Sequence, residues 1–132
     1  MATIFKKIID GEIPCYKVAE NDEFLAFLDV NPLKIGHTLV IPKIEVDYIF
    51  DIEDDLIAKM MIFAKHVAKS IQSAYPCNRI GVGVIGLEVA HAHIHLVPIN
   101  SMNDINFSNT KLILSKEQFI EISNKIAQNF NQ

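Results

Sequence analysis

The middle of the chain carries the apolar periodicity of an α-helix. Over residues 52–75, apolar side chains recur three or four positions apart, at Leu56, Met60, Phe63, Val67 and Ile71. This spacing places them on one face of a helix and leaves polar residues on the other face. Acidic residues stand at the start of the stretch, where they complement the helix dipole, and Pro76 follows it. The pattern predicts a long helix over Ile52–Tyr75.

Two further segments, one near each end of the chain, carry helix signals. Thr3 is a suitable N-cap for a short helix over Ile4–Asp10, and Gly11 is a suitable residue to end it. Ser115 is a suitable N-cap for a final helix that runs to about Asn129. We therefore expect one helix before the strands and one after them.

Short apolar segments elsewhere predict β-strands. They are Tyr16–Ala19, Phe24–Leu28, His37–Ile41, Arg79–Ile85 and His91–Val97. Four polar residues separate the first two segments, which indicates a hairpin. Hairpins and short connections favour an antiparallel sheet. We expect an α+β fold, with an antiparallel sheet of about five strands and the helices packed on one face, in a single domain over residues 1–132.

Charge and composition exclude several classes of protein. The net charge of −4 gives no sign of a nucleic-acid-binding or membrane-binding protein. No apolar run approaches the roughly 20 residues that span a bilayer. Charged residues interrupt the N-terminal segment, so we expect no signal peptide and a cytoplasmic location. Cys15 and Cys77 match no metal or redox motif, and buried thiols are the favoured interpretation, with a disulfide left open.

Three histidines stand at alternate positions in the sequence His-Ala-His-Ile-His. Side chains of a strand alternate between its two faces, so His91, His93 and His95 would share one face. The other face would enter the core, and its residues are Ala92, Ile94 and Leu96. A cluster of imidazoles on one side of a strand needs a chemical explanation.

Three interpretations of the histidine face remain open on the residues alone. A polar face turned to solvent is the first, although such faces usually carry Thr, Lys and Glu. A metal site is the second, but the outer two histidines would be roughly 13 Å apart, so two of the three with His37 would suit one ion better. Nucleophilic catalysis is the third, since a histidine nitrogen can attack phosphorus while an acceptor holds its other ring nitrogen.

The chain resembles the histidine-triad (HIT) family, in particular its Hint-like branch. The sequence HAHIHLVP carries the resemblance, with further matches at Thr3–Phe5, Ile8-Ile9, Gly11–Pro14, Leu25–Asp29, Asn31-Pro32 and Gly36–Pro42. The match covers residues 2–98 in order. It implies a HIT-like fold, a two-fold homodimer and a nucleotide hydrolase of the phosphoramidase type.

The resemblance also implies a role for each matching residue. His93 would attack the α-phosphorus and form a nucleotidyl-histidine, which water then hydrolyses. His95 and His37 would contact the phosphate, and the backbone carbonyl of His91 would orient the His93 ring. Asp29 would accept hydrogen bonds from the ribose hydroxyls, although a turn-capping role is the alternative.

The implied nucleobase slot is apolar. Its residues would be Ile4, Phe5, Ile8, Phe27 and Leu39. Plain core packing is the competing interpretation for each of them. The implied ligand is a purine nucleoside monophosphate, above all AMP, bound as its phosphoramidate or ester, with no metal or other cofactor.

The sequence departs from the family pattern just before the triad. Hint-like proteins usually offer Gly-Gln and a Ser or Thr there, after an Asn at the end of the preceding strand. This chain has Gly-Leu-Glu-Val instead, so two polar groups near the phosphate are missing. If Glu88 faces the site, it would repel an anionic leaving group and accept an N–H from an amine. The alternative function is a purine nucleotide-binding or interaction module with little turnover.

Overall fold

The computed structural model describes residues 2–130, and within this range five antiparallel strands form one sheet. The strands are β1 (Lys17–Glu20), β2 (Phe24–Leu28), β3 (Thr38–Pro42), β4 (Arg79–Gly83) and β5 (Ile94–Ile99). Their order across the sheet is β1-β2-β3-β5-β4, so β1 and β4 form the edges. The predicted α+β class and the predicted hairpin are confirmed.

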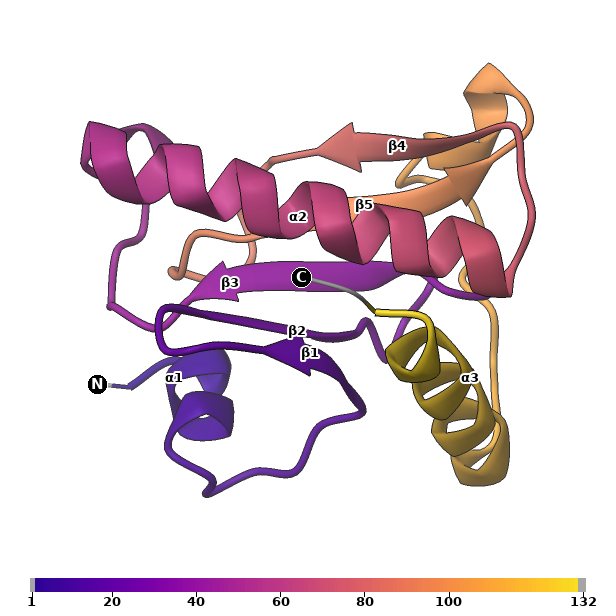
Figure 1. The fold of residues 1–132 in the computed structure, drawn as a ribbon, viewed down its shortest axis with the longest axis horizontal. Helices are drawn as coiled ribbons and strands as arrows, with labels where there is room; N and C mark the ends of the chain where they lie inside the picture. The colour runs from indigo at the N-terminus through magenta and orange to yellow at the C-terminus, as the bar shows by residue number, and fades with distance from the viewer. Residues whose placement is uncertain (1, 131–132) are drawn as a thin grey trace.

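Three α-helices and two short 3-10 helices accompany the sheet (Figure 1). The α-helices are α1 (Ile4–Ile9), α2 (Asp54–Ala74) and α3 (Lys116–Gln128), and the 3-10 helices are η1 (Ile49–Asp51) and η2 (Met102–Ile105). Thr3 caps α1 by accepting the Lys6 N–H, and Gly11 follows that helix with a φ of 80°. Ser115 and Gln118 form a capping box at the start of α3. The predicted capping residues are therefore confirmed.

Two strand boundaries differ from the prediction in a way that affects the histidines. The last strand begins at Ile94, so His91 and His93 precede it instead of lying within it. The edge strand β4 ends at Gly83, two residues earlier than expected. Both differences arise at the same place, because Gly83 is the last residue of β4 that pairs with β5, opposite His95. The residues between Gly83 and His93 form an irregular loop.

The main core lies between the sheet and the helices α2 and α3. From β2 the side chains of Phe24, Ala26 and Leu28 point into it, and each is less than 3% exposed. Phe63 of α2 packs against Phe24 at a ring-centroid distance of 5.6 Å. Ile94 and Leu96 enter the same core, as the alternation of the histidine segment predicted.

The opposite face of the sheet is covered by α1, which corrects the expectation that all helices pack on one face. Leu25 and Phe27 of β2 alternate with the core residues and contact Phe5 of α1 in a second, smaller apolar cluster. Helix α1 has only six residues, so it covers part of this face and no more. In Figure 1, α1 lies away from α2 and α3.

None of the helices in residues 2–130 is a candidate membrane span. Even α2, the longest of them, does not combine the length and the apolar character that crossing a bilayer requires. Its exposed face carries charged residues, including Lys65 and Lys69.

Candidate functional site

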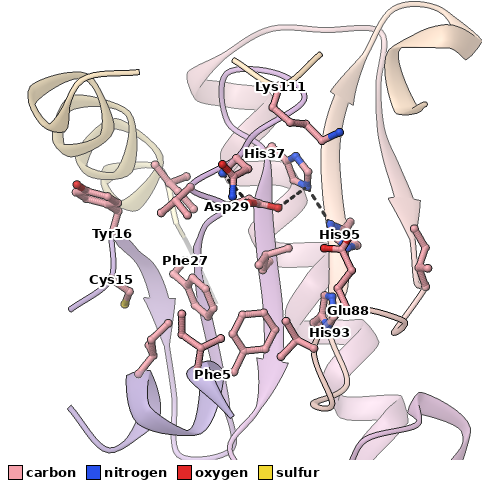
Figure 2. Close-up of a pocket in the computed structure, with 18 of the residues that line it drawn as sticks. Phe5, Cys15, Tyr16, Phe27, Asp29, His37, Glu88, His93, His95 and Lys111 are labelled. Atoms are coloured by element: carbon pink, nitrogen blue, oxygen red, sulfur yellow. Dashed lines mark hydrogen bonds and ion pairs between the residues drawn. The ribbon is translucent and has the colours of Figure 1, made fainter. Parts of the chain in front are cut away.

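A cavity of about 500 Å³ opens on the α1 side of the sheet (Figure 2). Its walls come from α1, β2, β3, the loop before β5 and the segment that follows η2. One part of the wall is apolar, and another carries histidines and an aspartate. A pocket of this size and composition is typical of a small-molecule site.

The apolar part of the wall contains every residue that the resemblance assigned to a nucleobase slot. They are Ile4, Phe5, Ile8, Phe27 and Leu39. The Phe5 and Phe27 rings meet edge to face at 5.6 Å, and Phe5 also meets the His93 ring at 5.1 Å. Val89 packs against the same cluster from the loop before β5. This wall offers flat apolar contact to a ring system, next to the histidines.

His93 is held in one tautomer by the backbone. Its Nδ1 lies 2.7 Å from the carbonyl oxygen of His91, and a carbonyl can only accept, so Nδ1 carries the proton. In the uncharged ring the Nε2 atom therefore keeps its lone pair. Since His93 lines the cavity, this arrangement presents a nucleophilic nitrogen at the wall.

His91 has a structural position. Its Nε2 donates to the carbonyl oxygen of Pro42 at 2.9 Å, and its side chain is 1% exposed. It does not line the cavity, and its Nδ1 is buried without a hydrogen-bond partner among the described residues. All three triad histidines are buried, but only His93 and His95 line the cavity, a division that strand alternation alone does not predict.

His37 and His95 form a hydrogen-bonded relay. The backbone N–H of Leu33 donates to Nδ1 of His37 at 3.0 Å, so the neutral His37 ring carries its proton on Nε2. That Nε2 lies 3.0 Å from Nδ1 of His95, which must accept. His95 then carries its single ring proton on Nε2, and this N–H is available as a donor.

Burial keeps both relay histidines uncharged. Desolvation lowers the pKa of His37 to about 3, with a further lowering by His95 and Lys111. Desolvation likewise lowers the pKa of His95 to about 4, helped by His93. At neutral pH the Nε2–H of His95 can donate a hydrogen bond to an anion, while the single N–H of His37 already donates to His95. Neither ring supplies a positive charge.

Asp29 lies beside the relay, at the end of β2. Its Oδ1 accepts the backbone N–H of Asn31 at 2.8 Å, which is the predicted turn-capping contact. Its Oδ2 lies 3.6 Å from Nε2 of His37 and lines the cavity. Burial raises the pKa of the Asp29 carboxyl, and the nearby Glu88 raises it further. The two interpretations of Asp29 are compatible, since one oxygen caps the turn and the other remains open to a ligand.

Asp29, His37 and His95 also have the spacing of a metal site, since one ligand atom from each lies within 4.8 Å of the others. The hydrogen bonds oppose this use. Nε2 of His37 carries a proton as long as Nδ1 accepts from Leu33, so it directs an N–H at the proposed ion. Metal binding through this atom would require an imidazolate or the loss of the backbone bond.

Two cavity residues beyond the predicted set come from the segment after η2. The Phe107 ring covers His95 at a centroid distance of 4.7 Å, and Lys111 lines the same end of the cavity. The segment has no helical or alternating pattern, so nothing in its sequence signals a site.

Glu88, which was predicted, lines the mouth of the cavity with an exposed side chain. Cys15 lines the far wall and is a half-buried free thiol, as is Cys77 elsewhere in the chain.

Comparisons with known proteins show which family the chain is similar to. The family profile described as HIT domain matches residues 10–102. An uncharacterized HIT-like protein of Borreliella burgdorferi is 38% identical over 135 residues, which cover 96% of each chain. The adenosine 5'-monophosphoramidase HNT1 of Saccharomyces cerevisiae is 39% identical over 98 residues, covering 74% of this chain and 62% of HNT1.

A solved structure shows that the likeness extends to the C-terminal segment. A zinc-bound histidine triad family protein of Mycobacterium smegmatis superimposes with a TM-score of 0.80 at 25% sequence identity. The superposition covers 97% of this chain and 95% of that one. The fold around the cavity is therefore shared with relatives over nearly the whole length, including the part after residue 98 where the sequence showed no resemblance.

Proposed function

The chain belongs to the histidine-triad (HIT) family, which includes nucleotide hydrolases, and from this premise we propose that it releases a nucleoside 5'-monophosphate by covalent catalysis through His93. The observation that carries the proposal is the hydrogen bond from His93 Nδ1 to the His91 carbonyl, which leaves Nε2 free beside the cavity. The favoured substrate class is an adenosine phosphoramidate, since HNT1 is an adenosine 5'-monophosphoramidase.

The proposed reaction has two steps. His93 Nε2 attacks the α-phosphorus and forms an N–P bond, while the bond from phosphorus to the leaving amine breaks and the amine takes up a proton. Water then attacks the same phosphorus, the N–P bond to His93 breaks, and the nucleoside monophosphate leaves with release of a proton. The Nε2–H of His95 is suited to donate to a phosphoryl oxygen in both steps, and Phe107 shields that histidine from one side.

The nucleotide would lie with its base against the apolar wall and its ribose at Asp29. Purines have a larger flat surface than pyrimidines, so we expect AMP and GMP to bind more tightly than CMP and UMP. Titration calorimetry with the four nucleotides measures this directly. A pyrimidine nucleotide as the tightest ligand would contradict the assignment of Phe5 and Phe27 to the base.

Detection of the covalent intermediate is the decisive test of the proposed mechanism. Rapid quenching of the enzyme and labelled adenosine phosphoramidate in base, where the N–P bond to histidine survives, followed by peptide mass spectrometry without acid, should detect AMP on the peptide that contains His93. A protein that binds AMP tightly but forms no adduct and no product would instead be a nucleotide-binding module, the alternative that the missing polar groups before the triad keep open.

We also propose that the reaction needs no metal. The support is the hydrogen bonding of His37, a member of the only candidate metal cluster found among residues 2–130. Its Nε2 carries a proton where a metal ligand would need a free lone pair. Turnover should persist after exhaustive treatment with EDTA and should not rise when Zn²⁺ is added. A strict requirement for a divalent ion would contradict the proposal.

The proposed assembly is a two-fold homodimer through the β4 edge and the outer face of α2. Val82 and Val84 near this edge are 53% and 42% exposed, and Met61 and Ile62 on α2 are 52% and 56% exposed. Pairing across a two-fold axis would cover both an unpaired strand edge and these apolar side chains. Sedimentation at micromolar concentration should show a dimer, and Val82→Lys should favour the monomer.

The expected cytoplasmic location stays a prediction, which cell fractionation would test.

A further inference from the structure

The cavity contains little positive charge for a site that is proposed to bind a phosphate. His37 and His95 are uncharged at neutral pH because of their lowered pKa values. Two carboxylate side chains, Asp29 and Glu88, line the same cavity. Without another cation, the local charge around a nucleotide phosphate would be negative, and neutral hydrogen-bond donors alone would have to compensate for it.

Lys111 is the single Lys or Arg among the residues described as lining the cavity. It lies on the same side of the cavity as His37 and His95, as Figure 2 shows. Its ammonium is near enough to lower the pKa of both His37 and Asp29. Its Nζ has no carboxylate within ion-pair distance among the residues that the structure describes.

The backbone holds the ammonium of Lys111 in place. Nζ donates to the carbonyl oxygen of Phe107 and to that of Asn109, the latter at 2.9 Å. An ammonium has three N–H donors, so one remains for a ligand. The neighbouring residue Leu112 donates its backbone N–H to the carbonyl oxygen of Pro32 at 2.8 Å, which ties the segment to the turn that follows Asp29.

We propose that Lys111 is a phosphate-binding residue, which supplies the positive charge for the nucleotide's phosphoryl oxygens that the neutral histidines lack. The inference rests on the proposed function, because it takes the nucleotide to lie in this cavity. It assigns a role to the segment after η2, where the sequence pattern indicated no site. A fixed ammonium at this position would stabilise the negative charge of the bound phosphate and of the transition state.

The test compares a charged ligand with its neutral counterpart. Calorimetry with AMP and with adenosine separates the phosphate contribution to binding from that of the base and ribose. In Lys111→Met, AMP affinity should fall about 10- to 100-fold, the usual effect of removing a charged hydrogen-bond partner, while adenosine affinity stays unchanged. Lys111→Arg should recover most of the AMP affinity, and AMP binding to Lys111→Met should depend less on salt than in the wild type.

The matched control is Lys69→Met, which removes the same charge from the exposed face of α2. It should leave both affinities unchanged. Equal losses of AMP and adenosine affinity in Lys111→Met would mean that Lys111 only supports its segment, and an unchanged AMP affinity would mean that it does not touch the phosphate. Either result overturns the inference while leaving His93 catalysis in place. If the wild type binds neither ligand, the proposed function fails as well, and the inference fails with it.

Discussion

The two faces of the sheet are built from the same set of strands but serve different functions. On the α2 and α3 side, Phe24 of β2 and Ile94 of β5 belong to the main core cluster, together with residues of both long helices. On the α1 side, Phe27 of β2 and Leu39 of β3 line the cavity, and the helix on this side has only six residues. The cavity is the space that α1 leaves open.

The difference shows how one sheet can combine stability with binding. The closed face contributes the close-packed contacts that stabilise the fold. The open face holds polar groups in fixed tautomers, since backbone atoms of His91 and Leu33 determine where the protons on His93 and His37 lie. Substitutions on the two faces should therefore have different consequences, and the following predictions test that difference.

The largest expected effect is on turnover by His93→Ala. The substitution removes the nucleophile from the open face, so we expect the turnover number to fall by roughly 10³-fold or more. Binding of AMP and the thermal unfolding temperature should change little. The control is His66→Ala, on α2 at the closed face, which should retain full activity. Activity of His93→Ala close to that of the wild type would exclude covalent catalysis through this residue.

The second prediction compares two phenylalanines of β2. Phe24 and Phe27 are 1% and 4% exposed, but they point to opposite faces of the sheet. Phe24→Ala should lower the free energy of unfolding by about 3–5 kcal/mol, since it leaves a void in a packed core. Phe27→Ala should cost roughly half as much, because that side chain already borders an open cavity, and should weaken AMP binding. Urea unfolding and calorimetry on both variants measure the two effects, and equal losses of stability would contradict the distinction.

The third prediction concerns acid stability. His37 and His95 have folded-state pKa values of about 3 and about 4, below the 6.5 of an unperturbed histidine, so unfolding takes up protons between these values. The free energy of unfolding should therefore decrease as the pH falls from about 6.5 toward 4, by several kcal/mol for the two groups together. The raised pKa of Asp29 acts in the opposite direction and reduces the slope.

His37→Asn tests the origin of that slope, because the Asn oxygen can still accept the Leu33 N–H. Denaturant unfolding at several pH values should show a shallower decrease for His37→Asn than for the wild type. His66→Asn, on α2, should keep the wild-type slope. A slope that does not change in His37→Asn would assign the acid sensitivity to other groups.

The smallest expected effect concerns leaving-group preference. Glu88 lines the mouth of the cavity with an exposed side chain, so solvent screens its charge. We expect a higher kcat/KM for adenosine phosphoramidates than for diadenosine polyphosphates, and Glu88→Ser should reduce this ratio by about 3- to 10-fold. Glu88→Gln separates charge from size, and Glu121→Gln on α3 is the control. An unchanged ratio in Glu88→Ser would show that the carboxylate does not select the leaving group.

Local periodicity predicted most of the regular structure. The spacing from Leu56 to Ile71 predicted α2, because a helix repeats every 3.6 residues whatever surrounds it. The four polar residues between the first two apolar segments predicted the hairpin of β1 and β2, and alternation predicted the core positions of Ile94 and Leu96. The helices that begin after Thr3 and Ser115 depend on side chains that accept a hydrogen bond from the backbone N–H three residues later, so the sequence predicted these helix starts as well.

The composition of the cavity was only partly predictable. The structure brings His93, His95, His37 and Asp29 together in one cavity with the five apolar residues that the resemblance implied, while their roles stay predictions. The resemblance did not show that His91 turns away to Pro42, since that depends on where β5 begins. It also gave no sign of Lys111, which belongs to an irregular segment.

The sequence by itself determined the helices, the strands and the residue types available for chemistry, because these depend on interactions between near neighbours in the chain. The tertiary structure decided which of those residues share a cavity and in which protonation state. His37 and His95 are 58 positions apart, yet one hydrogen bond between them, together with the Leu33 N–H, sets both tautomers. Lys111 joins them through the bond from Leu112 to Pro32. Contacts of this range depend on the whole packed fold, and no local pattern encodes them.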